Sequence, residues 1–220
     1  MIMTENKENS ISLTIVDAEN RTERRDAVEN RAKILETAVS LFAEHGVNDV
    51  NMADIAKAAG VGKGTLYRRF ANKGELCLAL LDTQMRDFQD GMLSRMQQLS
   101  ADGTPKLEQL DQFIDALVYF TETHSPLLCV VQREGLVPTS EDARIQLPHF
   151  WQHMTITGLL KTAVAEGELS AAVDIDYAAD ALLAPLKADI FRFQRSVRGF
   201  SLERISAGLR MIVHGLSQID

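Results

Sequence analysis

Apolar residues recur at helical spacing along almost the whole chain. In the first long segment, Ile34, Ala38, Leu41 and Phe42 fall on one face of a helix, and Gly46 provides a C-terminal stop. The alternation of apolar and polar positions that favours β-strands is almost absent. The pattern therefore predicts an all-α fold, with short helices early in the chain and long helices later.

The later helices are separated by short segments that contain glycine or proline. Such segments favour turns, and we expect them at residues 102–105, 124–126, 138–140, 166–167 and 198–199. The helices after the first are expected near residues 52–59, 63–70, 73–99, 106–123, 127–134, 142–166, 174–197 and 201–217. Pro185 lies inside one of these helices and is expected to kink it.

The N-terminal segment lacks the helical pattern. Residues 1–20 are polar apart from one apolar run over residues 11–16. A polar segment of this kind buries too little apolar surface to order itself, so residues 1–24 are expected to form a flexible arm.

Composition supports a folded chain, and charge qualifies the choice of partner. Of the 220 residues, 45% are apolar and 25% are charged, which excludes wholesale disorder. The net charge of −8, taken as an average, argues against nucleic acid as a partner. The charge is uneven, however: residues 1–80 carry 11 basic and 12 acidic groups, whereas residues 81–220 carry 12 and 19. Five basic residues and no acidic one fall between Lys57 and Lys73.

The cysteine content and the apolar runs point to a compartment. Cys77 and Cys129 are too few for a disulfide framework and fit a reducing environment. The longest apolar runs are far shorter than the roughly 20 residues of a membrane span, and no signal peptide is evident at the N-terminus. We therefore expect a soluble, cytoplasmic protein.

The segment over residues 51–70, NMADIAKAAGVGKGTLYRRF, carries the most information about function. Asn51 is a good N-cap for a short helix with one apolar face, and Gly60 supplies a tight turn after it. In the second short helix Leu66 and Phe70, four residues apart, face inward. The residues left facing solvent are Lys63, Gly64, Thr65, Tyr67 and Arg68.

Two short helices joined by a glycine turn form a helix-turn-helix, whose second helix can enter the major groove of B-DNA. Threonine and tyrosine can bond to phosphates or base edges, lysine and arginine neutralise phosphates, and glycine permits close approach to the backbone. The same pattern also fits a solvated helical hairpin with lysines on its outer face, and the pattern alone leaves that alternative open.

The segment from Ala27 to about Leu81 resembles the DNA-binding domain of the TetR family of bacterial transcriptional regulators. ILETAVSLFAEHG is similar to the first helix of that domain, DIAKAAGV to its second, and GKGTLYRRFANKGEL to its third helix and the start of its fourth. The resemblance implies a three-helix DNA-binding domain over residues 25–81. A larger helical domain over residues 82–220 is implied to bind a ligand and to dimerise through its last two helices.

The resemblance also assigns roles to single residues. Thr65 and Tyr67 would contact DNA from the recognition helix, and Gly64 would allow close approach. Lys73 would hold a phosphate, while Asn51 and Met52 would lie near the DNA backbone at the start of the second helix. Position 62 departs from the family pattern, because Gly62 stands where the family commonly has a serine or threonine as helix cap.

The basic residues before the first helix offer a weaker hypothesis. Arg21, Arg24 and Arg25 could reach an adjacent minor groove, as the basic arms of other DNA-binding folds do. The alternative is a solvated helix entry in which neighbouring acidic residues pair with these arginines, namely Glu23, Asp26 and Glu29.

The C-terminal helices supply candidates for a dimer interface and a ligand pocket. Small and apolar residues that permit close helix approach are Ala178, Ala181, Leu182, Gly208, Met211, Ile212 and Gly215. An interior rich in aromatic residues and methionine suits an apolar or amphipathic small molecule of unknown identity. Its candidate lining is Phe88, Met92, Met96, Phe113, Leu117, Phe120, Cys129, Trp151 and Met154, although each also fits a plain core.

Two other functions are weighed against this one. His149 and His153, four apart on an expected helix, could bind a metal together with His124 or Cys129, which would make the protein a metal sensor or give it a catalytic zinc. An enzyme fused to a DNA-binding head is the second alternative. The chain has no nucleophile elbow, P-loop or dinucleotide-binding turn, so we expect no catalysis and no cofactor.

Overall fold

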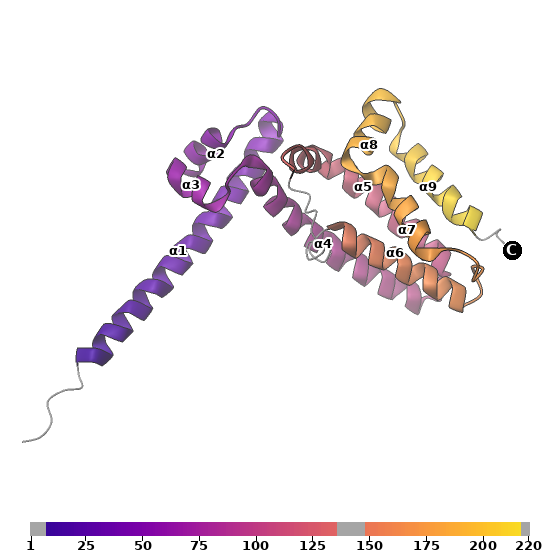
Figure 1. Cartoon of the computed structure of the whole chain (residues 1–220), viewed down its shortest axis with the longest axis horizontal. Helices are drawn as coiled ribbons and strands as arrows, with labels where there is room; N and C mark the ends of the chain where they lie inside the picture. Colours follow the sequence, from indigo (N-terminus) through magenta and orange to yellow (C-terminus); the bar gives the residue numbers. More distant parts are fainter. Residues whose placement is uncertain (1–7, 136–147, 217–220) are drawn as a thin grey trace, which may run out of the picture. The chain divides into compact units, whose positions relative to one another are not determined.

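The computed structural model describes residues 8–135 and 148–216, with side chains from residue 27 in the first range and from residue 150 in the second. All regular elements in these ranges are helical, so the predicted all-α class is confirmed (Figure 1). The chain divides into two compact units, Met1–Leu76 and Cys77–Asp220. The turn expected at residues 138–140 lies outside the described residues.

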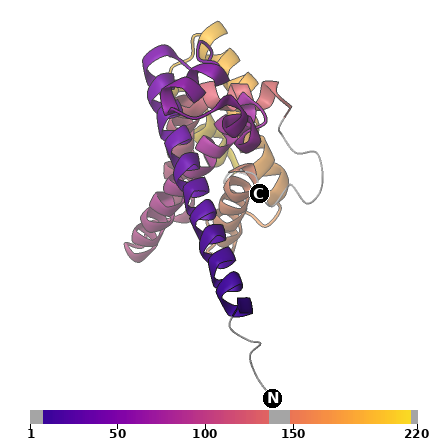
Figure 2. The same ribbon diagram turned by 90° about the vertical axis from the view of Figure 1, so that its left-hand side faces the viewer.

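The first unit is a small helical domain. It contains α1 (Glu8–His45), α2 (Met52–Ala59), α3 (Lys63–Arg69) and the first turn of α4 (Lys73–Ala101). Helix α2 packs against α1 and α3 packs against α2 (Figures 1 and 2). The apolar stripe predicted on the first helix is buried, since Ile34 and Ala38 have no exposed surface. The bounds of α2 agree with the prediction, and those of α3 differ by one residue.

Helix α1 begins earlier than the sequence pattern indicated. It runs without interruption from Glu8, whereas residues 1–24 were expected to lack secondary structure (Figure 2). The segment from Glu8 to His45 contains neither glycine nor proline, the residues that commonly end a helix. The helix that forms in the buried part of α1 therefore extends back to Glu8. The arm of the sequence prediction therefore has a helical backbone from Glu8 onward.

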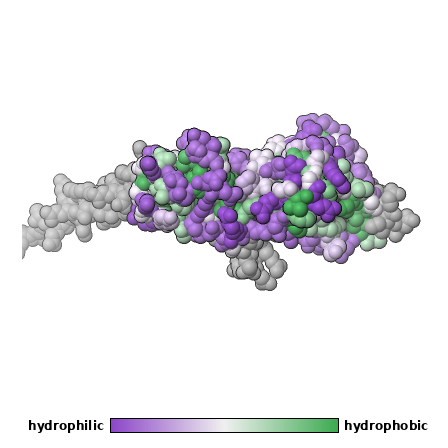
Figure 3. Space-filling view, turned by 90° about the horizontal axis from the view of Figure 1, so that it is seen from above, coloured by the Kyte–Doolittle hydropathy of each residue, from purple (hydrophilic) through white to green (hydrophobic). Residues whose placement is uncertain are grey.

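The second unit is built around α5 (Lys106–Arg133). Helices α6 (Pro148–Ala165), α8 (Ala188–Arg192) and α9 (Leu202–Leu216) pack against it, and α7 (Ile175–Leu183) packs against α6 (Figure 1). The core includes Phe113, Leu117, Leu160 and Phe191, all with no exposed surface. Apolar side chains also reach the surface of this unit among polar ones (Figure 3).

Two predicted breaks differ from the structure. Helix α5 continues through Pro126, where two separate helices were expected. The proline removes one helix hydrogen bond, but buried residues on both sides of it, such as Leu117 and Val130, hold the helix together.

The helix expected over residues 174–197 is interrupted in several places. It consists of α7, a 3₁₀ turn η2 (Ala184–Leu186), α8 and a π-helical turn η3 (Phe193–Val197). Pro185 lies in the first turn of η2, where its missing N–H costs nothing, and Lys187 then takes an extended conformation. The predicted kink is therefore a break.

Candidate functional site

Helix α2 begins with a capping box. The Asn51 side chain accepts hydrogen bonds from the backbone N–H groups of Ala53 (2.9 Å) and Asp54 (3.1 Å). In return, the Asp54 carboxylate accepts from the Asn51 N–H at 3.0 Å. Three backbone donors that a helix start leaves without partners are thereby satisfied. The Asn51 oxygen is engaged in this cap, which fixes where α2 begins.

The turn between α2 and α3 depends on a glycine. Gly60 has φ +64°, in the left-handed region that favours glycine, and its N–H donates to the carbonyls of Ala56 and Lys57. The Val61 N–H donates to the Ala56 carbonyl at 3.0 Å. These bonds end α2 within one turn and set the direction of α3, as expected for a helix-turn-helix.

Helix α3 has a buried face and an exposed one. Leu66 is fully buried and Phe70 is 3% exposed, so both point inward as predicted. The residues exposed to solvent on this helix are Lys63, Gly64, Tyr67, Arg68 and Arg69, and Thr65 is half-buried. A Cβ built on Gly64 would meet no atom within 4 Å, so the fold itself does not require a glycine there. Gly62 is the N-cap residue and makes no side-chain capping bond.

Lys73, which is predicted to hold a DNA phosphate, makes contacts within the protein. Its ammonium donates to the carbonyls of Val47, Asn48 (3.5 Å) and Val50 (2.5 Å), and it lies 5.7 Å from the centre of the Phe42 ring. An ammonium has three donors, and these three carbonyls engage them. Lys73 therefore ties the start of α4 to the loop before α2, and its contact with a DNA phosphate stays a prediction.

Met52 and the basic arm also bear on the predicted interface. The Met52 side chain is 6% exposed, so it belongs to the core and leaves only its backbone near the start of α2. The side chains of Arg21, Arg24 and Arg25 lie outside the described residues, and their contact with DNA stays a prediction.

Four of the predicted pocket residues form an aromatic cluster in the second unit. The Phe88 ring centre lies 4.6 Å from that of Phe120 and 6.1 Å from that of Trp151, and Phe113 lies 5.5 Å from Trp151. His124 stacks on Phe120 at 4.2 Å. The four large rings therefore pack against one another at tilted and edge-on angles, as aromatic side chains prefer.

The other candidates for the pocket lie at different depths. Met92 and Leu117 are core residues, Met96 packs against the core, and Met154 is 53% exposed. The Cys129 thiol approaches the carbonyl of Ala188 at 4.0 Å.

Two open grooves of about 370 Å³ each lie elsewhere on the second unit. None of the nine candidate residues lines either of them. One groove is lined by Glu108, Asp111, Gln112, Asp115, Ala116 and Arg210. The other contains an ion pair that joins α5 to η3, between Glu122 and Arg195. This pair has no local signature in the chain, because its partners lie 73 positions apart.

The candidates for a dimer interface divide into two groups. Ala178 and Leu182 are buried in the core of their own chain, because other residues of that chain cover their side chains. Met211 (71% exposed) and Ile212 (45% exposed) remain available on α9. Ala181 and Gly208 are half-buried and Gly215 is exposed.

The metal hypothesis gains no support among the described side chains. No group of three or more histidine, cysteine, aspartate or glutamate residues there could hold a metal ion. The His153 Nε2 atom lies 3.6 Å from Asp180 Oδ1, and the side chain of His149 lies outside the described residues. Within the described ranges, no helix is long and apolar enough to cross a membrane.

Comparison with known sequences identifies relatives of both units. The family profile "Bacterial regulatory proteins, tetR family" matches residues 34–80. An HTH-type transcriptional regulator of Staphylococcus aureus is 30% identical over 181 residues, which cover 82% of this chain and 90% of that protein. Another from the same species is 35% identical over 109 residues, and that match spans 50% of this chain and 57% of the relative.

Solved structures share the fold. Thermus thermophilus FadR, a TetR-family transcriptional repressor in complex with lauroyl-CoA, is 24% identical with a TM-score of 0.62, over 84% of this chain and 94% of that one. A putative transcriptional regulator from Saccharomonospora viridis in complex with choline is 21% identical with a TM-score of 0.64, and the match covers 85% of this chain and 96% of that one. The relatives are named as regulators of transcription, which are not enzymes. On the strength of the capped helix-turn-helix and of these matches, the chain belongs to the TetR family of helix-turn-helix transcriptional regulators.

Proposed function

We propose that this regulator is a repressor that binds a DNA operator through α3 and leaves it when a small molecule binds the second unit. The exposed face of α3 carries the proposal, since Lys63, Tyr67 and Arg68 point away from a helix that Leu66 fixes to the core. A protein with this role acts on the genome and belongs in the cytoplasm, as the two cysteines also suggest.

The proposed contacts divide by chemistry. Lys63 and Arg68 neutralise phosphates, and Thr65 and Tyr67 bond to phosphates or base edges. Gly64 lets the backbone of α3 approach the DNA closely. Asn51 acts through α2, because its side-chain oxygen caps that helix.

The aromatic cluster is the proposed effector site. Phe88, Phe113, Phe120 and Trp151 join α4, α5 and α6, so a ligand that separates these rings moves three helices relative to one another. The complexes of the two similar regulators with lauroyl-CoA and with choline support a small-molecule effector for this protein. An apolar or amphipathic effector fits the rings, and a coupling of about 1–3 kcal/mol changes operator affinity roughly 5–150-fold.

A homodimer completes the proposal. Two recognition helices must reach half-sites about 34–36 Å apart on one face of the DNA. The exposed apolar side chains that could form the contact lie on α8, η3 and α9, namely Ile190, Phe193, Val197, Met211 and Ile212. Sedimentation of the purified protein as a monomer at micromolar concentration would argue against this assembly.

Selection of genomic fragments by the purified protein, followed by sequencing, is the experiment that tests DNA recognition. On the operator obtained, Tyr67→Ala is expected to weaken binding about tenfold or more because it removes a side chain that bonds within the DNA groove. Tyr119→Ala is the matched control, because Tyr119 is 43% exposed on the second unit, close to the 49% of Tyr67. Equal affinity of the Tyr67→Ala variant and the wild type over a salt series would refute the assignment.

A further inference from the structure

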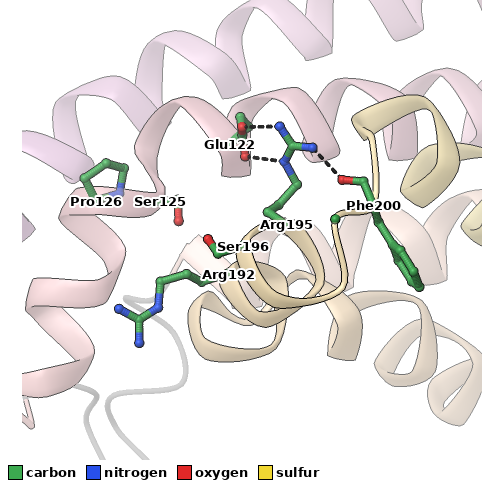
Figure 4. A pocket seen from close by; sticks show the side chains of 8 residues that line it. Glu122, Ser125, Pro126, Arg192, Arg195, Ser196 and Phe200 are labelled. Atoms are coloured by element: carbon green, nitrogen blue, oxygen red, sulfur yellow. Dashed lines mark hydrogen bonds and ion pairs between the residues drawn. The ribbon is translucent and has the colours of Figure 1, made fainter.

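One groove of the second unit has features that the proposed function does not use. It has a volume of about 370 Å³ and lies between the middle of α5 and the segment from α8 to the start of α9 (Figure 4). We call it the Arg192 groove, and its lining is Glu122, Ser125, Pro126, Arg192, Arg195, Ser196, Gly199 and Phe200. None of these residues belongs to the aromatic cluster proposed for the effector.

The first wall of the groove is a satisfied ion pair. Arg195 Nε lies 3.1 Å from Glu122 Oε2 and Arg195 Nη2 lies 2.8 Å from Glu122 Oε1, while Nη1 donates to the Phe200 carbonyl at 2.5 Å (Figure 4). The hydrogen bond to Glu122 raises the pKa of Arg195. Because both carboxylate oxygens and all three guanidinium nitrogens are engaged, this pair shapes the groove and leaves no net charge in it.

Arg192 is the charge that remains. It lines the groove and is exposed, and Figure 4 draws no bond from its guanidinium to the other residues shown. The described residues that line the groove therefore carry a net charge of +1. The surrounding segment is basic as well, since residues 187–210 hold six basic and two acidic groups in a unit that is acidic overall. This local field attracts an anion.

Two hydroxyl groups add polar character to the groove. The side chains of Ser125 on α5 and Ser196 on η3 face each other across the groove (Figure 4). Pro126 has no N–H, so the helix hydrogen bond that the Glu122 carbonyl would accept from residue 126 is missing. The Phe200 ring points away from the groove (Figure 4). The guanidinium carbons of Arg204 and Arg198 lie 4.0 Å and 5.2 Å from the centre of this ring. The groove thus offers a cation and two hydroxyl groups.

We propose that the Arg192 groove binds a small hydroxylated carboxylate, a molecule the size of a sugar acid. The guanidinium of Arg192 matches the two oxygens of a carboxylate, and the hydroxyls of Ser125 and Ser196 bond to hydroxyl groups of the ligand. A volume of about 370 Å³ lies at the small end of ligand sites. A net charge of +1 suits a monoanion and leaves the pair of Glu122 and Arg195 intact.

Calorimetric titration of the full-length protein with gluconate tests the site. Glucose, of similar size and hydroxyl content but neutral, is the control ligand. Gluconate is expected to bind saturably and glucose is not. Arg192→Gln is expected to weaken gluconate binding about tenfold or more, since it removes a charged hydrogen bond. Ser196→Ala is expected to weaken it severalfold.

The control variant is Arg198→Gln, which removes an exposed arginine of the same segment that does not line the groove. It is expected to change gluconate affinity by less than about twofold. Equal binding of gluconate and glucose, no binding of gluconate, or equal weakening in the Arg192→Gln and Arg198→Gln variants would overturn the proposal. The titration uses protein without DNA, so its outcome is independent of whether the protein represses transcription.

Discussion

Replacement of Lys73 by methionine separates two roles that a lysine at this position can have. In the structure its ammonium donates to the carbonyls of Val47, Asn48 and Val50. In the family-based prediction it holds a DNA phosphate instead. The variant Lys73→Met keeps the aliphatic stem and removes the charge and the donors, so it tests the ammonium alone.

The magnitude follows from these hydrogen bonds. A hydrogen bond to a charged group contributes about 1.5–3 kcal/mol, and Lys73 is half-buried, so water replaces part of that stabilisation in the variant. The cation over the Phe42 ring adds about 0.5–1 kcal/mol. We expect the free energy of unfolding to fall by about 2–3 kcal/mol. For a chain of this size that decrease lowers the Tm by roughly 4–12 °C.

Two measurements distinguish the roles. Calorimetry gives the Tm, and fluorescence anisotropy on the selected operator gives the slope of log K against log salt concentration. If Lys73 is a structural tether, the variant has a lower Tm and an unchanged slope. If Lys73 binds phosphate, the variant has an unchanged Tm, and its slope is shallower by about 0.9 for each phosphate that it no longer neutralises. The exposed Lys161 supplies the control: Lys161→Met is expected to shift stability by less than about 0.5 kcal/mol. An unchanged Tm with a shallower slope would refute the tether.

Three further changes probe the recognition helix and α9. Gly64→Ala is expected to leave the Tm unchanged or raise it, because the new Cβ meets no atom within 4 Å and alanine favours helix by up to about 1 kcal/mol. Gly64→Ala should weaken operator binding about tenfold in a gel-shift titration. The control is Gly91→Ala in α4, where a new Cβ also meets no atom within 4 Å, and it should not weaken binding. Equal operator binding by the two variants would exclude a close approach of the DNA at Gly64. Gly62→Ser is expected to raise stability by a few tenths of a kcal/mol through a new cap, measurable as a small rise in midpoint in urea unfolding. Hydrogen bonds from the backbone N–H of Glu203 and from Ser201 lower the pKa of the Glu203 carboxyl below its ordinary value of 4.5. The charged carboxylate therefore stabilises the folded state above that pH. This stabilisation disappears as the pH falls through the pKa of the folded state. The Tm difference between wild type and Glu203→Gln should therefore shrink towards zero on acidification, and a constant difference would contradict this account.

Local chemistry explains why the helix-turn-helix could be predicted from the sequence. The cap at Asn51 and the left-handed glycine at Gly60 act within four residues of themselves, so their effect is visible in the chain. The inward direction of Leu66 and Phe70 follows from helical spacing, which is equally local. These features place α2 and α3 to within one residue.

Tertiary packing explains what the sequence did not predict. Lys73 donates to carbonyls 23 to 26 positions earlier, and a carbonyl has no signature in a sequence. Pro126 ordinarily ends a helix, and only the burial of its flanking turns shows that α5 continues. The aromatic residues chosen as pocket candidates do meet in space, but periodicity alone does not distinguish a ligand site from a packed core.

The π-helical turn η3 sets the register of the segment that carries Arg195. A π turn contains one residue more than an α turn, which is equivalent to a single-residue insertion in a helix. Deleting one residue before Arg195 within η3 would restore α-helical winding and rotate that side chain by roughly 100° about the helix axis. Arg195 would then point away from Glu122 on α5. In evolutionary terms, the pairing of these two helices depends on the length of the chain at this point as much as on the identity of its residues.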